Sequence, residues 1–247
     1  MSKKIQHRLY VDCRLPGNGL VILSPEQSHY LGNVMRAGVG DAVALFNGSE
    51  GEWASDIVEI KKKAIALRIR SQTKAQQFEP DLMLAFAPIK KARIDFIAQK
   101  TTELGVCHLQ PIITRRTNVE RVKTERLHTN AVEAAEQCER LTIPSVSEPI
   151  KLDKLLESWP TERMIMFCDE EMTGRSAHFA LTGLSEKQKT RPWAIFIGPE
   201  GGFDDTERAS IKAHANTIVV SLGPRVLRAD TAAMAAISLW QSALGDW

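Results

Sequence analysis

The sequence lacks the features that mark membrane and secreted proteins. No uninterrupted apolar run approaches the roughly 20 residues that a membrane-spanning helix needs. The first eight residues are basic but no apolar core follows them, so we expect no signal peptide. The four cysteines lie far apart in sequence, which excludes a CxxC redox motif and a metal knuckle; they are Cys13, Cys107, Cys138 and Cys168. We therefore expect a cytoplasmic protein with buried free thiols, no metal and no membrane contact.

The sequence also lacks the loops that bind nucleotide phosphates. It has no P-loop, because no Gly-Lys-Ser/Thr follows its glycine-rich stretch. That stretch, residues 198–202 (Gly-Pro-Glu-Gly-Gly), does not match Gly-x-Gly-x-x-Gly either. The absence of these loops therefore argues against a nucleotide-dependent metabolic enzyme.

Charge is unevenly distributed, although the whole chain has a net charge of only +2. Residues 1–78 carry 11 Lys and Arg against 7 Asp and Glu, a net charge of +4, whereas residues 79–247 carry 21 against 23, a net charge of −2. A basic N-terminal part indicates contact with an anionic partner, and a solvated surface is the alternative.

The N-terminal part is patterned as short strands and tight turns. Residues 24–35 begin with Ser-Pro-Glu-Gln, which predicts a capped helix. Asn47 and Gly48 separate two apolar runs and are typical of a β-hairpin. Many short strands with one helix predict a small β-barrel over residues 1–75. Residues 71–79 are polar and are expected to form the linker.

Strand and helix patterns alternate through residues 79–247, which predicts a second domain of the α/β class with a parallel sheet covered on both faces. Its last two apolar runs, residues 193–197 and 217–222, each end in a glycine-containing loop that opens a helix. Ligands bind such sheets outside the carboxyl ends of the strands. We therefore expect these two loops to hold a small cofactor, with glycine allowing close approach to the backbone.

The second of these loops carries two arginines near the start of a helix, where the helix dipole disfavours cations. They are Arg225 and Arg228. We interpret them as facing an anion or a developing negative charge. The alternative is that one of them pairs with Asp230 or Glu200.

Both loops together resemble the paired signature of the SPOUT methyltransferases. The matching stretches are residues 197–203 (Ile-Gly-Pro-Glu-Gly-Gly-Phe) and residues 222–232 (Leu-Gly-Pro-Arg-Val-Leu-Arg-Ala-Asp-Thr-Ala). More narrowly, they resemble the family that methylates N3 of a uridine in 16S ribosomal RNA, and residues 29–41, 99–106 and 134–140 fit the same family. Asp230 stands where that pattern has a glutamate, which keeps the carboxylate.

This resemblance implies a fold and a function. The fold would be a PUA-like RNA-binding β-barrel followed by an α/β domain tied in a trefoil knot. The function would be methyl transfer from S-adenosylmethionine to 16S rRNA of the small ribosomal subunit by a homodimer. A non-catalytic RNA-binding protein of the same fold is the alternative, and the intact glycine loop and both arginines argue against it.

The resemblance also singles out site residues. Three loops are expected to bind the cofactor, through Phe167, Gly198, Pro199, Glu200, Gly202, Leu222, Gly223, Val226, Leu227 and Ala232. For catalysis we expect Arg228 to stabilise negative charge on the base, with Glu200 removing a proton or holding Arg228.

The candidate RNA contacts are basic side chains and one imidazole ring, namely Arg8, Arg14, His29, Arg36, Lys90 and Arg225. Contacts to phosphates would give affinity and salt dependence rather than sequence choice. His29 is a candidate for stacking on a base, and an ordinary surface histidine is the alternative. Lys90 and Arg93 lie at a predicted helix start, where the helix dipole disfavours cations, which suggests contact with RNA. The alternative is that both are ordinary solvated surface residues.

Overall fold

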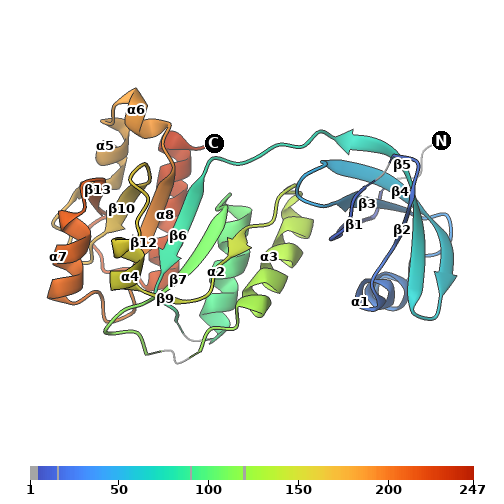
Figure 1. Cartoon of the computed structure of the whole chain (residues 1–247), viewed down its shortest axis with the longest axis horizontal. Helices are drawn as coiled ribbons and strands as arrows, with labels where there is room; N and C mark the ends of the chain where they lie inside the picture. The colour runs from blue at the N-terminus through green and yellow to red at the C-terminus, as the bar shows by residue number, and fades with distance from the viewer. Residues whose placement is uncertain (1–4, 16, 90, 119–120) are drawn as a thin grey trace. The chain divides into compact units, whose positions relative to one another are not determined.

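The computed structural model describes residues 5–15, 17–89, 91–118 and 121–247, without the side chains of Lys91 and Ala92. Lys90, a predicted RNA contact, lies outside the described residues. The chain divides into two compact units (Figure 1). One comprises Met1–Phe78 with Ala135–Ile143, and the other comprises Glu79–Ala134 with Pro144–Trp247.

The first unit is built on one five-stranded sheet. Its strands are β1 (His7–Tyr10), β2 (Leu20–Ile22), β3 (Ala42–Phe46), β4 (Glu52–Lys61) and β5 (Ala64–Lys74). They lie in the order β1-β3-β4-β5-β2, and of the described strand pairs β1–β3 alone is parallel. The loop with Asn47 and Gly48 joins β3 to β4 as predicted. Because β5 continues to Lys74, the predicted start of the linker at residue 71 was wrong.

The predicted capped helix is present in this unit. Ser24 Oγ accepts a hydrogen bond from Gln27 N at 3.2 Å, and Gln27 Oε1 accepts one from Ser24 N at 3.3 Å. These two bonds form a capping box at the start of α1 (Pro25–His29). They satisfy two backbone donors that a helix start otherwise leaves unpaired. The second half of the predicted helix is a π-helix, η1 (Tyr30–Val34).

The guanidinium of Arg8 is a structural group of the first unit. It lies over the Phe46 ring, 3.7 Å from its centroid, and its Nε is 2.7 Å from Glu52 Oε2. Its other nitrogens donate to the carbonyl oxygens of Ala135 and Arg140 at 2.7 and 2.6 Å. Only 10% of the side chain is exposed. These contacts inside the protein argue against the predicted contact of Arg8 with RNA.

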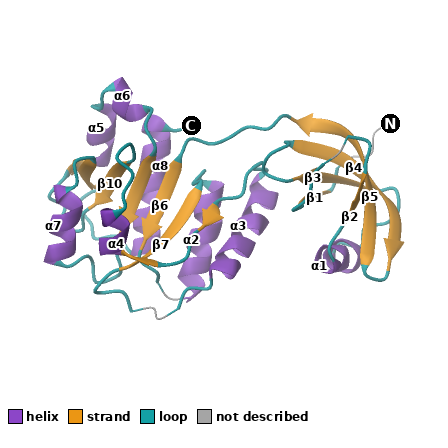
Figure 2. Ribbon diagram, in the orientation of Figure 1, coloured by secondary structure: helices purple, strands orange, loops and turns teal. Residues whose placement is uncertain are grey.

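A parallel sheet of eight strands forms the centre of the second unit (Figure 2). The strands are β6 (Leu82–Phe86), β7 (His108–Ile113), β8 (Ser145–Val146), β9 (Ile150–Lys151), β10 (Met164–Cys168), β11 (Arg175–Ser176), β12 (Trp193–Ile197) and β13 (Thr217–Ser221). Their order is β11-β13-β10-β12-β6-β7-β8, with β9 pairing β7. Every described pair is parallel, as the alternating pattern predicted.

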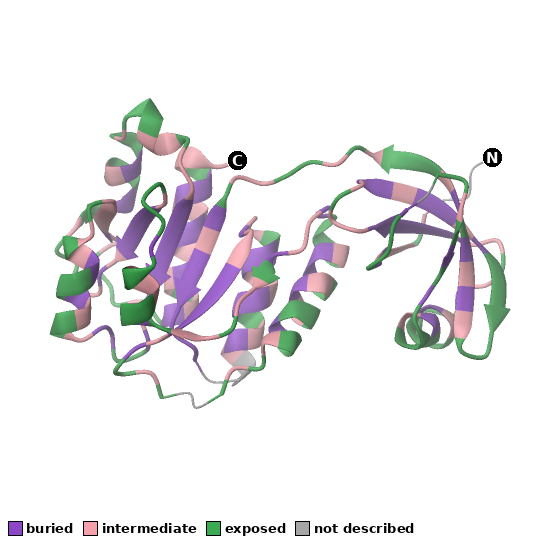
Figure 3. Cartoon of the chain, viewed as in Figure 1, coloured by how far each residue is buried: buried purple, intermediate pink, exposed green. Residues whose placement is uncertain are grey.

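Helices cover both faces of this sheet. They are α2 (Lys91–Glu103), α3 (Thr124–Cys138), α4 (Leu152–Glu157), α5 (Ala177–Thr182), α6 (Glu186–Lys189), α7 (Asp205–Ala213) and α8 (Ala229–Leu244). Side chains of α2, α3, α5 and α8 pack on one face, and those of α4 and α7 pack on the other. All five residues of β12 are buried because alternate side chains enter the two cores, as Figure 3 shows for the central strands.

The structure also shows the lengths of the helices and the exposure of the cysteines. Within the described residues, every helix is too short or too polar to cross a bilayer. The cysteines are free, but Cys13 and Cys138 are exposed and Cys107 and Cys168 are partly buried. The expectation of buried thiols was therefore wrong for Cys13 and Cys138.

Replacing Arg8 with alanine should lower the free energy of unfolding by about 3 kcal/mol, because the buried Glu52 carboxylate loses its nearest cation and keeps the Thr73 hydroxyl and a distant Lys74. Urea unfolding of the whole chain, followed by circular dichroism, measures this loss. Lys61→Ala is the control, because it breaks an exposed pair with Glu59 and should cost about 0.5 kcal/mol or less. Equal losses in the two variants would contradict the structural role of Arg8.

Candidate functional site

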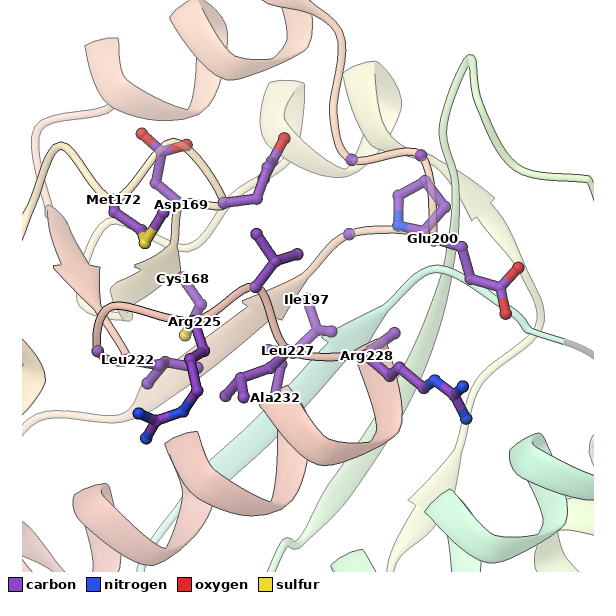
Figure 4. Close-up of a pocket in the computed structure, with 18 of the residues that line it drawn as sticks. Cys168, Asp169, Met172, Ile197, Glu200, Leu222, Arg225, Leu227, Arg228 and Ala232 are labelled. Atoms are coloured by element: carbon purple, nitrogen blue, oxygen red, sulfur yellow. The ribbon is translucent and has the colours of Figure 1, made fainter.

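Three loops meet at one edge of the second unit's sheet. Strands β13, β10 and β12 are adjacent and parallel, so their carboxyl ends lie together. The loops that follow them enclose a cavity of about 590 Å³ (Figure 4). This volume falls in the range of small-molecule sites. The first residues after β10, residues 198–202 and residues 222–228 form most of its wall.

Nine of the ten residues predicted to bind a cofactor line this cavity. They are Gly198, Pro199, Glu200, Gly202, Leu222, Gly223, Val226, Leu227 and Ala232. Arg225 and Arg228 line it as well. Phe167 does not, because it is fully buried against the ring of Phe203, with 5.4 Å between the centroids. The next residue, Cys168, reaches the cavity in its place.

Two positions in the 198–202 loop require glycine. Gly202 has a φ of +70°, and a Cβ there would lie 2.3 Å from Glu170 Oε1. At Gly198, a Cβ would lie 2.9 Å from Cε2 of Phe203. The loop therefore lies so close to neighbouring groups that any side chain at these two positions would displace it.

Contacts from three other segments fasten the same loop. Phe203 N donates to Glu170 Oε1 at 3.0 Å, which ties the loop to the segment after β10. Arg116 Nη1 donates to the carbonyl of Gly201 at 2.8 Å, from the segment after β7. Arg93 Nη1 of α2 lies 3.2 Å from Glu200 Oε1. The loop is thus held from several directions by charged side chains.

A cluster of charges supports the first of these contacts. Arg208 of α7 is 8% exposed, and its Nη2 lies 2.6 Å from Glu170 Oε1. It also pairs with Glu171, and its Nε lies 3.2 Å from Asp169 Oδ1. Lys212 Nζ lies 2.6 Å from Asp169 Oδ2. One nearly buried guanidinium therefore joins three consecutive acidic residues to the helix that follows the loop.

The Asp169 carboxylate is fully buried within this cluster. Burial on its own would raise the pKa of Asp169, because a charge is less stable away from water. Hydrogen bonds from Lys212, Thr173 and the Glu171 amide outweigh burial and lower the pKa. Asp169 is therefore ionised at neutral pH.

Within the part of the chain that the structure describes, the two arginines of the 222–231 loop have no partners. Both are exposed, and among the described residues no hydrogen bond or ion pair engages either guanidinium. Glu200 and Asp230, their predicted alternative partners, both contact Arg93 instead. Figure 4 shows Arg228 and Glu200 extending on the same side of the cavity and Arg225 on the other.

Apolar groups complete the wall, notably Ile197, Leu222 and Leu227. Burial raises the pKa of the Cys168 thiol, so this sulfur is neutral and a poor nucleophile. Within the described part of the chain, no cluster of His, Cys, Asp and Glu is arranged to hold a metal ion. The cavity therefore offers an apolar wall, accessible backbone groups and two free cations at its rim.

The remaining RNA candidates lie in the first unit. Arg14, His29 and Arg36 are exposed there. His29 Nδ1 lies 2.8 Å from Asn33 Nδ2, a contact within the turn that follows α1. The exposure of these three side chains is compatible with contact to RNA, and their role stays a prediction.

Arg93, Arg116 and Glu170 are site residues whose contacts the sequence did not predict. Arg93 was noted only as a cation at a helix start, and it instead reaches across to the loop after β12. The acidic triplet that contains Glu170 was visible after a buried strand, but its cation, Arg208, is 38 positions away. No local spacing pairs residues so distant in the chain.

Comparisons with known proteins agree with this architecture. Residues 76–241 match the profile of a family described as an RNA methyltransferase domain. Residues 23–70 match an RNA methyltransferase PUA domain. The PUA match lies within the first unit, and the methyltransferase match covers most of the second unit together with residues 76–78 and 135–143 of the first.

Whole proteins with the same arrangement are also similar. A ribosomal RNA small subunit methyltransferase E from Rickettsia conorii is 32% identical over 94% of this chain and 93% of its own length. A Legionella pneumophila methyltransferase solved with bound SAM is 32% identical, with a TM-score of 0.86 over 97% of this chain and 98% of that one. A Neisseria gonorrhoeae ribosomal RNA small subunit methyltransferase E bound to S-adenosyl methionine is 26% identical, with a TM-score of 0.86 over 98% and 99%.

Asp169→Asn should lower the free energy of unfolding by about 1–3 kcal/mol near neutral pH, because Lys212 and Arg208 lose a buried anionic partner. Since folding lowers the pKa of Asp169, the unfolded chain binds this proton more readily than the folded one. The advantage of the wild type over the variant should thus be complete above about pH 5 and should shrink as pH falls below about 4.

Urea unfolding of both proteins between about pH 3 and pH 7 measures this difference. Asp153→Asn, which changes an exposed carboxylate at the start of α4, is the control and should change the free energy of unfolding by about 0.5 kcal/mol or less. A difference between wild type and Asp169→Asn that stays constant across the range would contradict the assignment.

Proposed function

Because the chain belongs to the RNA methyltransferase family, we propose that it transfers a methyl group from S-adenosylmethionine to N3 of a uridine in 16S rRNA of the small ribosomal subunit. The observation that carries this proposal is the glycine-walled cavity at the ends of β10, β12 and β13. It lies in a chain whose fold superposes on S-adenosylmethionine-bound methyltransferases with TM-scores of 0.86.

The cavity suits this cofactor chemically. Ile197, Leu222 and Leu227 supply an apolar wall for an adenine ring, and backbone groups of the two glycine-containing loops supply polar contacts. When bound, S-adenosylmethionine supplies a methyl group already activated by a sulfonium. The protein therefore has mainly to orient the reactants and to exclude competing geometries.

Arg228 is the group that we assign to the nucleobase. N3 of a uridine carries a proton and becomes nucleophilic only when that proton leaves and negative charge develops on the base. A guanidinium at the cavity rim with no carboxylate partner is placed to stabilise that charge electrostatically. Arg225, on the other side of the cavity, is assigned to the RNA backbone.

The first unit would supply further RNA affinity, through the exposed Arg14, His29 and Arg36. From the family resemblance we also infer a trefoil knot in the region of the 222–232 loop, a homodimer, and action in the cytoplasm. Size-exclusion chromatography with light scattering tests the dimer directly.

The function is tested by incubating the protein with labelled S-adenosylmethionine and small ribosomal subunits that lack the modification, or the naked RNA. Mass spectrometry of digested RNA should then find one N3-methylated uridine. Gly202→Ala should abolish the transfer, because its Cβ would collide with Glu170. Gly48→Ala is the matched control, with a φ of +83° but open space around it. Cofactor binding without transfer to either RNA would favour a non-catalytic RNA-binding protein.

Arg228→Ala should lower the single-turnover rate by about 10²–10³-fold, because charge developing on the base would lose its cation. The dissociation constant for S-adenosylmethionine, measured by calorimetry, should change by less than about threefold, since backbone groups carry that affinity. Arg225→Ala, in the same loop, should raise KM for RNA with little effect at saturating RNA. An unchanged single-turnover rate in Arg228→Ala would remove this residue from the mechanism.

A further inference from the structure

Arg93 lines the cavity from an unusual position. It lies in the first turn of α2, where the helix dipole disfavours a cation, and its side chain is 34% exposed. Its Nη1 lies 3.2 Å from Glu200 Oε1, and its Nε lies 3.8 Å from Asp230 Oδ2. One planar guanidinium thus contacts the loop after β12 and the first turn of α8 together.

Glu200 lies in the 198–202 loop, and Asp230 directly follows the loop that carries both rim arginines. Asp230 is two positions from Arg228, and Glu200 extends on the same side of the cavity as Arg228 (Figure 4). Either carboxylate would be a natural partner for Arg228 if it were free. In the structure Arg93 engages both, and Arg228 keeps its guanidinium unpaired among the described residues.

The contact also bears on the role of Glu200. A carboxylate that accepts from a guanidinium is held in a fixed direction, and the oxygen that accepts is occupied by that contact. Glu200 therefore suits the task of holding the loop better than the task of removing the N3 proton. Arg93 suits this bridge better than a lysine would, because its fork can address two acceptors from one plane.

We propose that Arg93 is a positioning residue that holds Glu200 and Asp230, fixes the 198–202 loop against α2, and thereby leaves Arg228 free for the nucleobase. The kinetic part rests on the proposed methyltransferase function, whereas the part concerning the loop does not. Glu200 then acts as the partner of Arg93 and not as the general base.

The loop part is tested on the ligand-free protein by hydrogen–deuterium exchange. Arg93→Ala and Glu200→Ala should each speed exchange of peptides covering residues 198–206 by about threefold or more, because one anchor of the loop is lost. Arg126→Ala is the matched control, since it breaks an arginine pair with Asp95 of the same helix α2 away from the cavity. Unchanged exchange in Arg93→Ala, or the same increase in Arg126→Ala, would overturn this part.

The kinetic part uses single-turnover methyl transfer with saturating cofactor. Arg93→Ala should slow transfer about tenfold or more, and Arg93→Lys should recover part of the loss because it keeps the charge without the fork. The double variant with Glu200→Ala should be no slower than the slower single variant, since the two residues act as one unit. Multiplicative losses would overturn the proposal, as would an Arg93→Lys protein as slow as Arg93→Ala.

Glu200→Gln separates holding from proton removal. Its amide oxygen still accepts from Arg93, so the rate should stay within about fivefold of wild type and the pH–rate profile should keep its shape. A large loss with a changed acid limb would identify Glu200 as the base and overturn the proposal. If the wild type methylates no RNA, the methyltransferase proposal fails, whereas the exchange experiment still decides whether Arg93 holds the loop.

Discussion

The side-by-side, parallel alignment of β13, β10 and β12 is the constraint on which the rest of this structure depends. Hydrogen bonds pair these strands in register, and β10 and β12 are buried on both faces. Hydrophobic burial therefore determines where their carboxyl ends lie, before any polar residue of the site makes a contact. The loops after β10 and β13, which begin 53 positions apart in the chain (221 − 168), become neighbours only because of this pairing.

Polar groups then determine the shape that the loops adopt. The 198–202 loop contains three glycines and a proline and has few interactions of its own, so its conformation is imposed from outside. The carboxylate of Glu170, which is partly exposed, and the nearly buried guanidinium of Arg208 do this as an ion pair. Desolvation of Arg208 offsets much of the stability that its ion pairs would otherwise add. The main effect of these contacts is therefore to fix one conformation of the loop.

The sequence was informative about elements and loops because their signals are local. Alternation of apolar runs and helices identified the parallel sheet, and Ser24 with Gln27 identified a helix start. Partner choice was not local. Arg8 looked like a surface cation because nothing nearby in sequence reveals Glu52 or the carbonyls of Ala135 and Arg140. Phe167 and Cys168 differ by one position, and only the pleat of β10 determines which of them meets the cavity.

The first unit is assembled from two stretches of chain, because Ala135–Ile143 belongs to it although it lies between two parts of the second unit in sequence. Tyr10 N donates to Glu136, and Lys74 pairs with Glu139 across this seam. A gene fragment that stops at residue 78 would therefore encode an incomplete module. Tyr10 N would lose its acceptor Glu136, and Arg8 would lose the carbonyl oxygens of Ala135 and Arg140. Recombination that exchanged this module between proteins would have to move two separate pieces together, which favours inheritance of the two units as a single cassette.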